Sequence, residues 1–173
     1  MGYTVRAART RDVPAIRKLI DSNVESGRLL SKATVTLYED VQEFCVAELS
    51  HDATLAGCGA LHVMWEDLAE VRTVAVREDC QGLGIGHGIV DVLLQRARAV
   101  GVDRVFCLTF AVDFFGRHGF SEISGTPVAA EVYQELLRSY DEGVAEFLDL
   151  GWVKPNTLGN TRMLLHLLPG RGK

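Results

Sequence analysis

Apolar and polar residues alternate along several short stretches of the chain, which is the pattern of half-buried β-strands. These stretches lie at 3–8, 43–49, 54–65, 69–76 and 103–110. Residues 50–53 are polar and predict a hairpin turn between the second and third strands. Helical spacing of apolar residues predicts a first helix that is capped by Asp12 and ends near Gly27. Residues 29–40 fit either a loop or one short helix.

A second helix is predicted over residues 85–100, between the strands at 69–76 and 103–110. A strand, a glycine-rich turn, a helix and a strand form a βαβ unit, so these two strands should be parallel. Downstream, the sequence predicts a short helix at 112–120 ended by Gly119, a strand after it, and a helix at 129–140. Residues 163–168 are expected to form a last strand. That strand could close the sheet within the chain or pair with a second copy.

The 173 residues are 47% hydrophobic and 24% charged, which is typical of a globular protein. We expect one domain over residues 1–168 and a flexible tail at 169–173. The net charge of -5 argues against a nucleic-acid-binding protein. The four cysteines form no C-x-x-C pair and the histidines have no metal-ligand spacing, so neither a disulfide framework nor a metal is expected. No apolar run approaches 18 residues, and we expect a cytoplasmic protein.

The segment 81–88 carries a glycine at every second position, at 82, 84, 86 and 88. It lies between a predicted strand and a predicted helix, where backbone amides are unpaired and glycine lets a ligand approach closely. Such a turn binds phosphate or pyrophosphate. No Lys-Ser or Lys-Thr follows these glycines, which excludes a Walker A loop, and the G-x-G-x-x-G pattern of dinucleotide-binding folds fails as well. The pattern that fits is Q-x-x-G-x-G, from Gln81 to Gly86.

That pattern resembles the pyrophosphate loop of the GCN5-related N-acetyltransferase (GNAT) family. AEVRTVAV at 69–76 is similar to the family's fourth strand, and FFGRHGFSEI at 114–123 is similar to its F-Y-x-x-x-G-F segment. Residues 29–48 and 57–76 resemble the branch that acetylates the α-amine of glutamate. The resemblance implies an α/β fold with a mixed, mostly antiparallel central sheet flanked by helices. A splayed parallel strand pair would hold acetyl-CoA.

The resemblance also implies which residues bind the cofactor. They are Val74, Ala75, Val76, Gln81, Gly82, Leu83, Gly84, Ile85, Gly86, His87 and Phe115. The N–H of Val74 is the expected oxyanion donor. Phe115 stands where many members have a tyrosine that protonates the leaving thiolate. The general acid is therefore water, another side chain, or not needed, and Phe115 either packs on the cofactor or belongs to the core.

Three charged residues are candidates for the substrate side. Glu70 resembles the glutamate that histone-type members carry on the same strand and is the candidate general base. The alternative is a solvated edge-strand carboxylate or a partner of Arg72. Arg72 lies two residues on and could clamp an α-carboxylate, unless it forms a surface salt bridge. Lys32 is a second candidate anion binder, or a solvated loop lysine.

Together with these residues, the resemblance implies an enzyme that transfers acetyl from acetyl-CoA to the α-amine of L-glutamate or L-glutamine, the first step of arginine biosynthesis. The cysteines are expected in the core, so transfer would be direct. The family implies a homodimer, and the chain is expected to be a stand-alone form. Two alternatives stay open: acetylation of another amine (a polyamine, a drug or a protein), and a non-catalytic coenzyme A-binding module.

Overall fold

The computed structural model describes residues 2–25, 29, 32–150 and 159–167. The chain divides into two compact units. The first consists of Met1–His62 and Val71–Val100, and the second of Val63–Glu70 and Gly101–Lys173. Among the described helices, none combines the length and the hydropathy needed to cross a membrane.

The first unit contains an antiparallel group of strands. Its elements are β1 (Tyr3–Ala7), β2 (Phe44–Leu49), β3 (Leu55–Trp65) and β4 (Leu68–Val76), and the helices α1 (Val13–Glu25), α2 (Thr34–Glu39) and α3 (Ile85–Val100). Short 3-10 turns are η1 (Thr10–Asp12), η2 (Val41–Glu43) and η3 (Glu78–Cys80). β2 pairs antiparallel with both β1 and β3. β3 and β4 each continue into the second unit.

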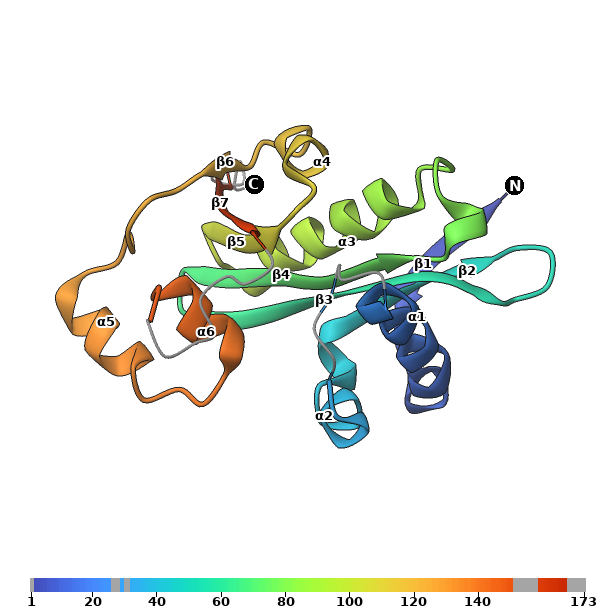
Figure 1. The fold of residues 1–173 in the computed structure, drawn as a ribbon, viewed down its shortest axis with the longest axis horizontal. Coiled ribbons are helices and arrows are strands. Elements are labelled where there is room, and N and C mark those ends of the chain that lie inside the picture. Colours follow the sequence, from blue (N-terminus) through green and yellow to red (C-terminus); the bar gives the residue numbers. More distant parts are fainter. Residues whose placement is uncertain (1, 26–28, 30–31, 151–158, 168–173) are drawn as a thin grey trace. The chain divides into compact units, whose positions relative to one another are not determined.

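Helices cover both faces of these strands (Figure 1). On one face, α1 and α2 bury an apolar cluster against β2 and β3. Its fully or nearly fully buried members are Val13, Ile16, Leu19, Ile20, Leu37, Phe44, Val46, Cys58, Ala60 and Ala75. On the other face, α3 approaches β3 at Gly57 and Gly59. A Cβ at Gly59 would lie 2.7 Å from Ile89, so glycine is what allows this close packing.

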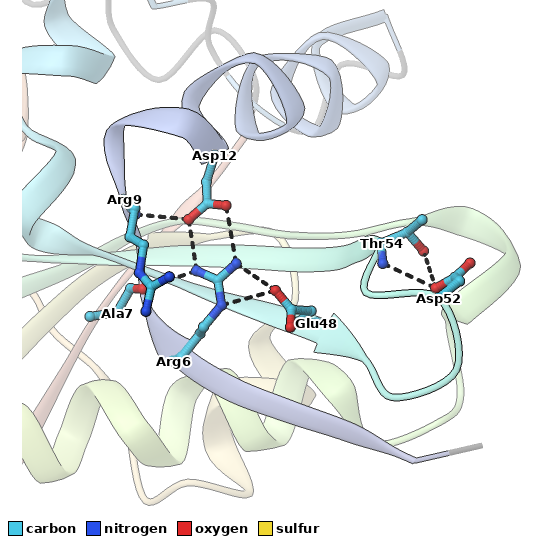
Figure 2. A network of polar contacts seen from close by, with 7 residues as sticks. All are labelled: Arg6, Ala7, Arg9, Asp12, Glu48, Asp52 and Thr54. Carbon is cyan, nitrogen blue, oxygen red and sulfur yellow. Dashed lines mark hydrogen bonds and ion pairs between the residues drawn. The ribbon is translucent and has the colours of Figure 1, made fainter.

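An ion network joins β1, β2 and the start of α1. The Arg6 guanidinium lies between two carboxylates, with Nη1 2.7 Å from Asp12 and Nη2 2.6 Å from Glu48 (Figure 2). Asp12 also accepts the backbone N–H of Arg9 at 2.8 Å. Asp12 therefore stabilises the start of this helical segment as predicted, but it does so from the third position of η1, by reaching back to the preceding residue.

The second unit is built on the parallel pair that the βαβ pattern predicted. Residues Leu68–Glu70 of β4 pair in parallel with residues 104–106 of β5 (Arg104–Thr109). β7 (Thr161–His166) pairs antiparallel with β5 and with β6 (Ser121–Glu122). The last strand therefore closes the sheet within the chain. The predicted splay of β4 and β5 stays a prediction.

Three short helices complete the second unit: α4 (Val112–Gly116), α5 (Ala130–Leu136) and α6 (Glu142–Phe147). A second apolar cluster joins α5 and α6 to the strands. Its buried members are Met64, Leu68, Phe106, Leu136, Val144, Phe147, Leu148 and Leu164.

Over the described residues, the strand order is β1-β2-β3-β4-β5-β7-β6, a mixed seven-stranded sheet flanked by helices. The predicted fold class is confirmed, and residues 29–40 include the short helix α2. Some predicted boundaries were wrong. The short helix α4 ends at Gly116, before the turn at Gly119. The helix predicted at 129–140 is α5, which is shorter and ends at Leu136. The helix α6 that follows it was not predicted.

The single domain at 1–168, the homodimer and the cytoplasmic location stay predictions. The expected tail at 169–173 and the end expected for the first helix, near Gly27, lie outside the described residues.

Candidate active site

The glycine-rich segment forms an exposed turn that leads directly into α3. Gln81, Gly82, Leu83 and Gly84 are all exposed, and α3 begins at Ile85. Gly82 and Gly84 both have φ of +77°, a conformation that other residues adopt at a cost. No atom lies within 4 Å of a Cβ built at Gly82. The glycines therefore serve backbone conformation and leave the outer side of the turn open.

Tyr3 of β1 holds the start of α3 in place. The hydroxyl of Tyr3 donates a hydrogen bond to the carbonyl of Gly84 at 3.1 Å. A Cβ at Gly88 would lie 2.5 Å from the same hydroxyl, so Gly88 makes room for Tyr3 rather than for a ligand. The backbone N–H groups at the start of an α-helix have no intrahelical partner, and the helix dipole is positive there. Residues 82–87 therefore present amide donors suited to a diphosphate.

β4 is irregular next to the residues predicted to bind the pantetheine arm. Thr73 is a non-glycine residue with φ of +57° and is 9% exposed. Its carbonyl accepts a hydrogen bond from the Cys58 thiol at 3.7 Å. Positive φ within a strand interrupts the regular ladder, as at a β-bulge. The irregular position directly precedes Val74, Ala75 and Val76. An interrupted ladder is what the expected free N–H of Val74 would need.

Arg72 lies on β4 in a cluster of charged side chains. Its Nη2 is 2.9 Å from an oxygen of Glu43 and 3.6 Å from Asp40, and its side chain is only 10% exposed. Glu43 also contacts the Nδ1 of His62 at 2.6 Å. The expected surface salt bridge is thus a half-buried network. His62 on β3 belongs to this network and is half-buried.

The charge of Lys32 also acts on Asp40, one of the two carboxylates beside Arg72. Burial and then the nearby Glu43 raise the pKa of Asp40, whereas the positive charges of Arg72 and Lys32 oppose that rise. The charges of both predicted anion-binding residues therefore act on one carboxylate. Asp40 and Glu43 were not predicted as site residues, although both lie within the segment 29–48 that carries the family resemblance.

Glu70 is buried at the beginning of β4, in the second unit, and is 3% exposed. β4 lies between β3 and β5, so the alternative of a solvated edge-strand carboxylate is wrong. Its neighbour in the parallel register is Phe106. Its carboxylate lies against the first turn of α6, where a Cβ at Gly143 would be 2.0 Å from Oε2. A carboxylate in such a place is a good candidate for proton transfer, since active-site carboxylates are commonly shielded from bulk water.

Phe115 is 6% exposed and packs within an aromatic group on α4. Its ring lies 5.1 Å from Phe114 and 5.3 Å from Phe120, both in edge-to-face geometry. These contacts place Phe115 in the core, and a contact with the cofactor stays a prediction.

The four cysteines are all free and buried. Burial raises the pKa of Cys45 to about 11 and of Cys58 to about 12. Burial also raises the pKa of Cys107, helped by the charge of Glu70, and that of Cys80. Thiols in this state are poor nucleophiles. Over the part of the chain that is described, no three His, Cys, Asp or Glu residues gather as a metal site would require.

The first unit thus has an exposed glycine turn at the start of α3 and an irregular strand, and the second unit has a buried carboxylate. A profile of the Acetyltransferase (GNAT) family matches residues 14–120. The chain belongs to this family. It is an acyltransferase that uses acetyl-CoA, as the resemblance implied.

Within the family, the chain is similar to amino-acid acetyltransferases. A Mycobacterium tuberculosis protein named amino-acid acetyltransferase is 62% identical over 167 residues, which are 94% of each chain. A Mycobacterium tuberculosis crystal structure in complex with CoA and NLQ is also 62% identical, with a TM-score of 0.91 over 95% of this chain and 99% of that one.

A more distant structure confirms the fold alone. It is the N-acetylglutamate synthase of Neisseria gonorrhoeae in complex with coenzyme A and N-acetyl-glutamate. Its TM-score is 0.75 at 24% identity, over 97% of this chain and 36% of that one.

Proposed function

We propose that this protein transfers the acetyl group of acetyl-CoA directly to the α-amine of L-glutamate or L-glutamine, the reaction class that begins arginine biosynthesis. The observation that carries the amino-acid assignment is the 62% identity, over nearly the whole chain, to an amino-acid acetyltransferase. The positions of Glu70 and Arg72 on one strand support it, because an amine-activating carboxylate and a carboxylate-binding cation suit an α-amino acid.

In this proposal the backbone of residues 82–87 binds the diphosphate of acetyl-CoA, and residues 74–76 bind its pantetheine arm. The N–H of Val74 donates to the thioester oxygen as negative charge develops there. The open space around Gly82 and the positive φ of both Gly82 and Gly84 fit such a ligand. Gln81, Leu83 and His87 would line the same turn.

Glu70 removes a proton from the α-ammonium group, directly or through a water, so that the neutral amine attacks the acetyl carbon. The C–N bond forms, the C–S bond breaks, and coenzyme A leaves as a thiolate, which takes up the second proton that the nitrogen loses as the amide forms. The buried thiols, with their raised pKa values, argue against an acetyl-cysteine intermediate. The general acid stays open, because Phe115 provides no hydroxyl.

Arg72 would bind the α-carboxylate of the amino acid. Its Nη2 lies 2.9 Å from Glu43 and 3.6 Å from Asp40. The substrate carboxylate would therefore share the guanidinium with protein carboxylates. Lys32 would add positive charge nearby.

Asp40 and Glu43 support a second candidate function, because two carboxylates beside the strand favour a cationic amine such as a polyamine. Release of free thiol from acetyl-CoA distinguishes the candidates when it is measured with L-glutamine, L-glutamate, spermidine or no acceptor. We expect rapid release with an amino acid. Release with spermidine alone would establish the second function, and no release with any acceptor would leave a coenzyme A-binding module.

A further inference from the structure

The first turn of α6 lies directly against the carboxylate of Glu70. Gly143, the second residue of α6, is buried. A Cβ built at Gly143 would lie 2.0 Å from Oε2 of Glu70 and 2.8 Å from its Cδ. Both distances are far inside van der Waals contact, so any side chain at position 143 would have to displace this carboxylate.

The backbone of α6 does not itself require a glycine here. Gly143 is helical and is not one of the positive-φ glycines of the described chain. Alanine stabilises a helix relative to glycine, because glycine loses more backbone entropy on folding. The helix start is already capped, since Asp141 accepts the N–H of Val144 at 3.1 Å. What glycine provides at this position is space for Glu70.

The other end of α6 is fixed to the strand beside Glu70. The Phe147 ring packs edge to face on that of Phe106, with centroids 5.3 Å apart, and Phe106 is the register partner of Glu70 on β5. Both rings are fully buried. α6 is therefore anchored over this part of the sheet, and a clash at Gly143 is relieved most easily by movement of the Glu70 side chain.

We propose that Gly143 is a positioning residue, and that its missing side chain sets where the Glu70 carboxylate lies for proton transfer. This inference rests on the proposed role of Glu70 as the general base. A displacement of about 1 Å in a reacting group can lower a rate by up to two orders of magnitude.

The test is a double-mutant cycle of Gly143→Ala and Glu70→Gln, with kcat measured across pH. We expect Gly143→Ala to lower kcat about tenfold, to move the pH at half-maximal kcat, and to leave KM for acetyl-CoA unchanged within about twofold. In the Glu70→Gln background it should lower kcat no further. Gly116→Ala is the matched control, since it adds a Cβ to another helical glycine with no atom within 4 Å.

Any other outcome contradicts the proposed role of Gly143, the proposed role of Glu70, or both. If Glu70→Gln is impaired but Gly143→Ala has the wild-type kcat and pH profile, Gly143 is not a positioning residue and the proposed function stands. An equal loss in both backgrounds would show a general structural effect and would also refute the inference. If Glu70→Gln keeps the wild-type kcat, the base assignment fails, and the inference fails with it.

A second variant covers the case in which Gly143→Ala does not fold. Combining it with Glu70→Asp shortens the acidic side chain by one methylene and relieves the clash. Recovery of the fold in the double variant supports the contact, and no recovery contradicts it.

Discussion

The turn at residues 81–87 and the carboxylate of Glu70 are built in opposite ways. The turn uses consecutive residues, whose backbone conformation provides the chemistry: Gly82 and Gly84 have positive φ, and α3 begins directly after them. Glu70 is a single side chain whose surroundings come from Phe106 and Gly143, which are distant in the sequence.

Because of this difference, we expect the turn and the surroundings of Glu70 to respond differently to substitution. In the turn, we expect a side chain to be tolerated wherever the backbone conformation survives, because the amides are the proposed ligands. Around Glu70, residues 68–70 pair in register with β5, and the position of one carboxylate matters. We therefore expect changes at the turn to alter KM for acetyl-CoA, and changes around Glu70 to alter kcat.

The largest effect is expected for Glu70→Gln. Loss of a general base lowers kcat by about a hundredfold and flattens its rise toward alkaline pH, because the amide cannot accept the ammonium proton. Thiol release across pH measures it, and KM for acetyl-CoA should not change. An unaltered pH profile would remove Glu70 from the mechanism.

Arg72→Ala should raise KM for the amino acid about tenfold, which corresponds to about 1.4 kcal/mol of lost substrate binding, and leave KM for acetyl-CoA unchanged. Arg104→Ala is the control, since Arg104 on β5 makes a comparable ion pair, 2.7 Å from Asp67. An equal rise in both variants, or no rise in Arg72→Ala, would contradict the clamp.

Gly82→Ala tests the turn. Alanine at φ of +77° is strained by about 1 kcal/mol, and relief of that strain would move the amides, so KM for acetyl-CoA should rise about fivefold with kcat little changed. Gly101→Ala provides a matched control, because Gly101 has φ of +101° and open space around it but follows the other end of α3. The prediction fails if the two variants have the same KM.

The smallest effect is expected for Asp12→Asn, which should lower the free energy of unfolding by about 1 kcal/mol and change neither KM nor kcat. Hydrogen bonds from Arg6 hold the pKa of Asp12 below its ordinary value. The ionised carboxylate therefore stabilises the fold fully above that ordinary value, and the contribution is lost as pH falls through the lowered pKa. Denaturant unfolding should show the difference from wild type shrinking below about pH 4. A pH-independent difference would contradict this origin.

The sequence predicted best those features of the fold that depend on residues close together in the chain. The strands around α3, the parallel pair and the exposed glycine turn all follow from local spacing and from the absence of side chains at 82 and 84. The buried setting of Glu70 could not be predicted, because it depends on α6, more than 70 residues downstream.

Some missed features did leave a signal in the sequence. Asp141 followed by apolar residues at 144, 147 and 148 is a helix start with an apolar face. By contrast, Asp40 directly follows α2 and Glu43 lies in η2, and they meet Arg72 only in the folded chain. The positive φ of Thr73 has no local cause, since threonine disfavours it, and it arises from the tertiary setting of β4.

The proposed function depends on the binding of coenzyme A by backbone amides at the start of α3. The most direct measurement follows the backbone amide signals of the ¹⁵N-labelled protein by NMR during titration with coenzyme A. We expect the largest shifts at residues 82–87 and 74–76, with all of them saturating together. Saturable binding with unchanged signals at those residues would contradict it.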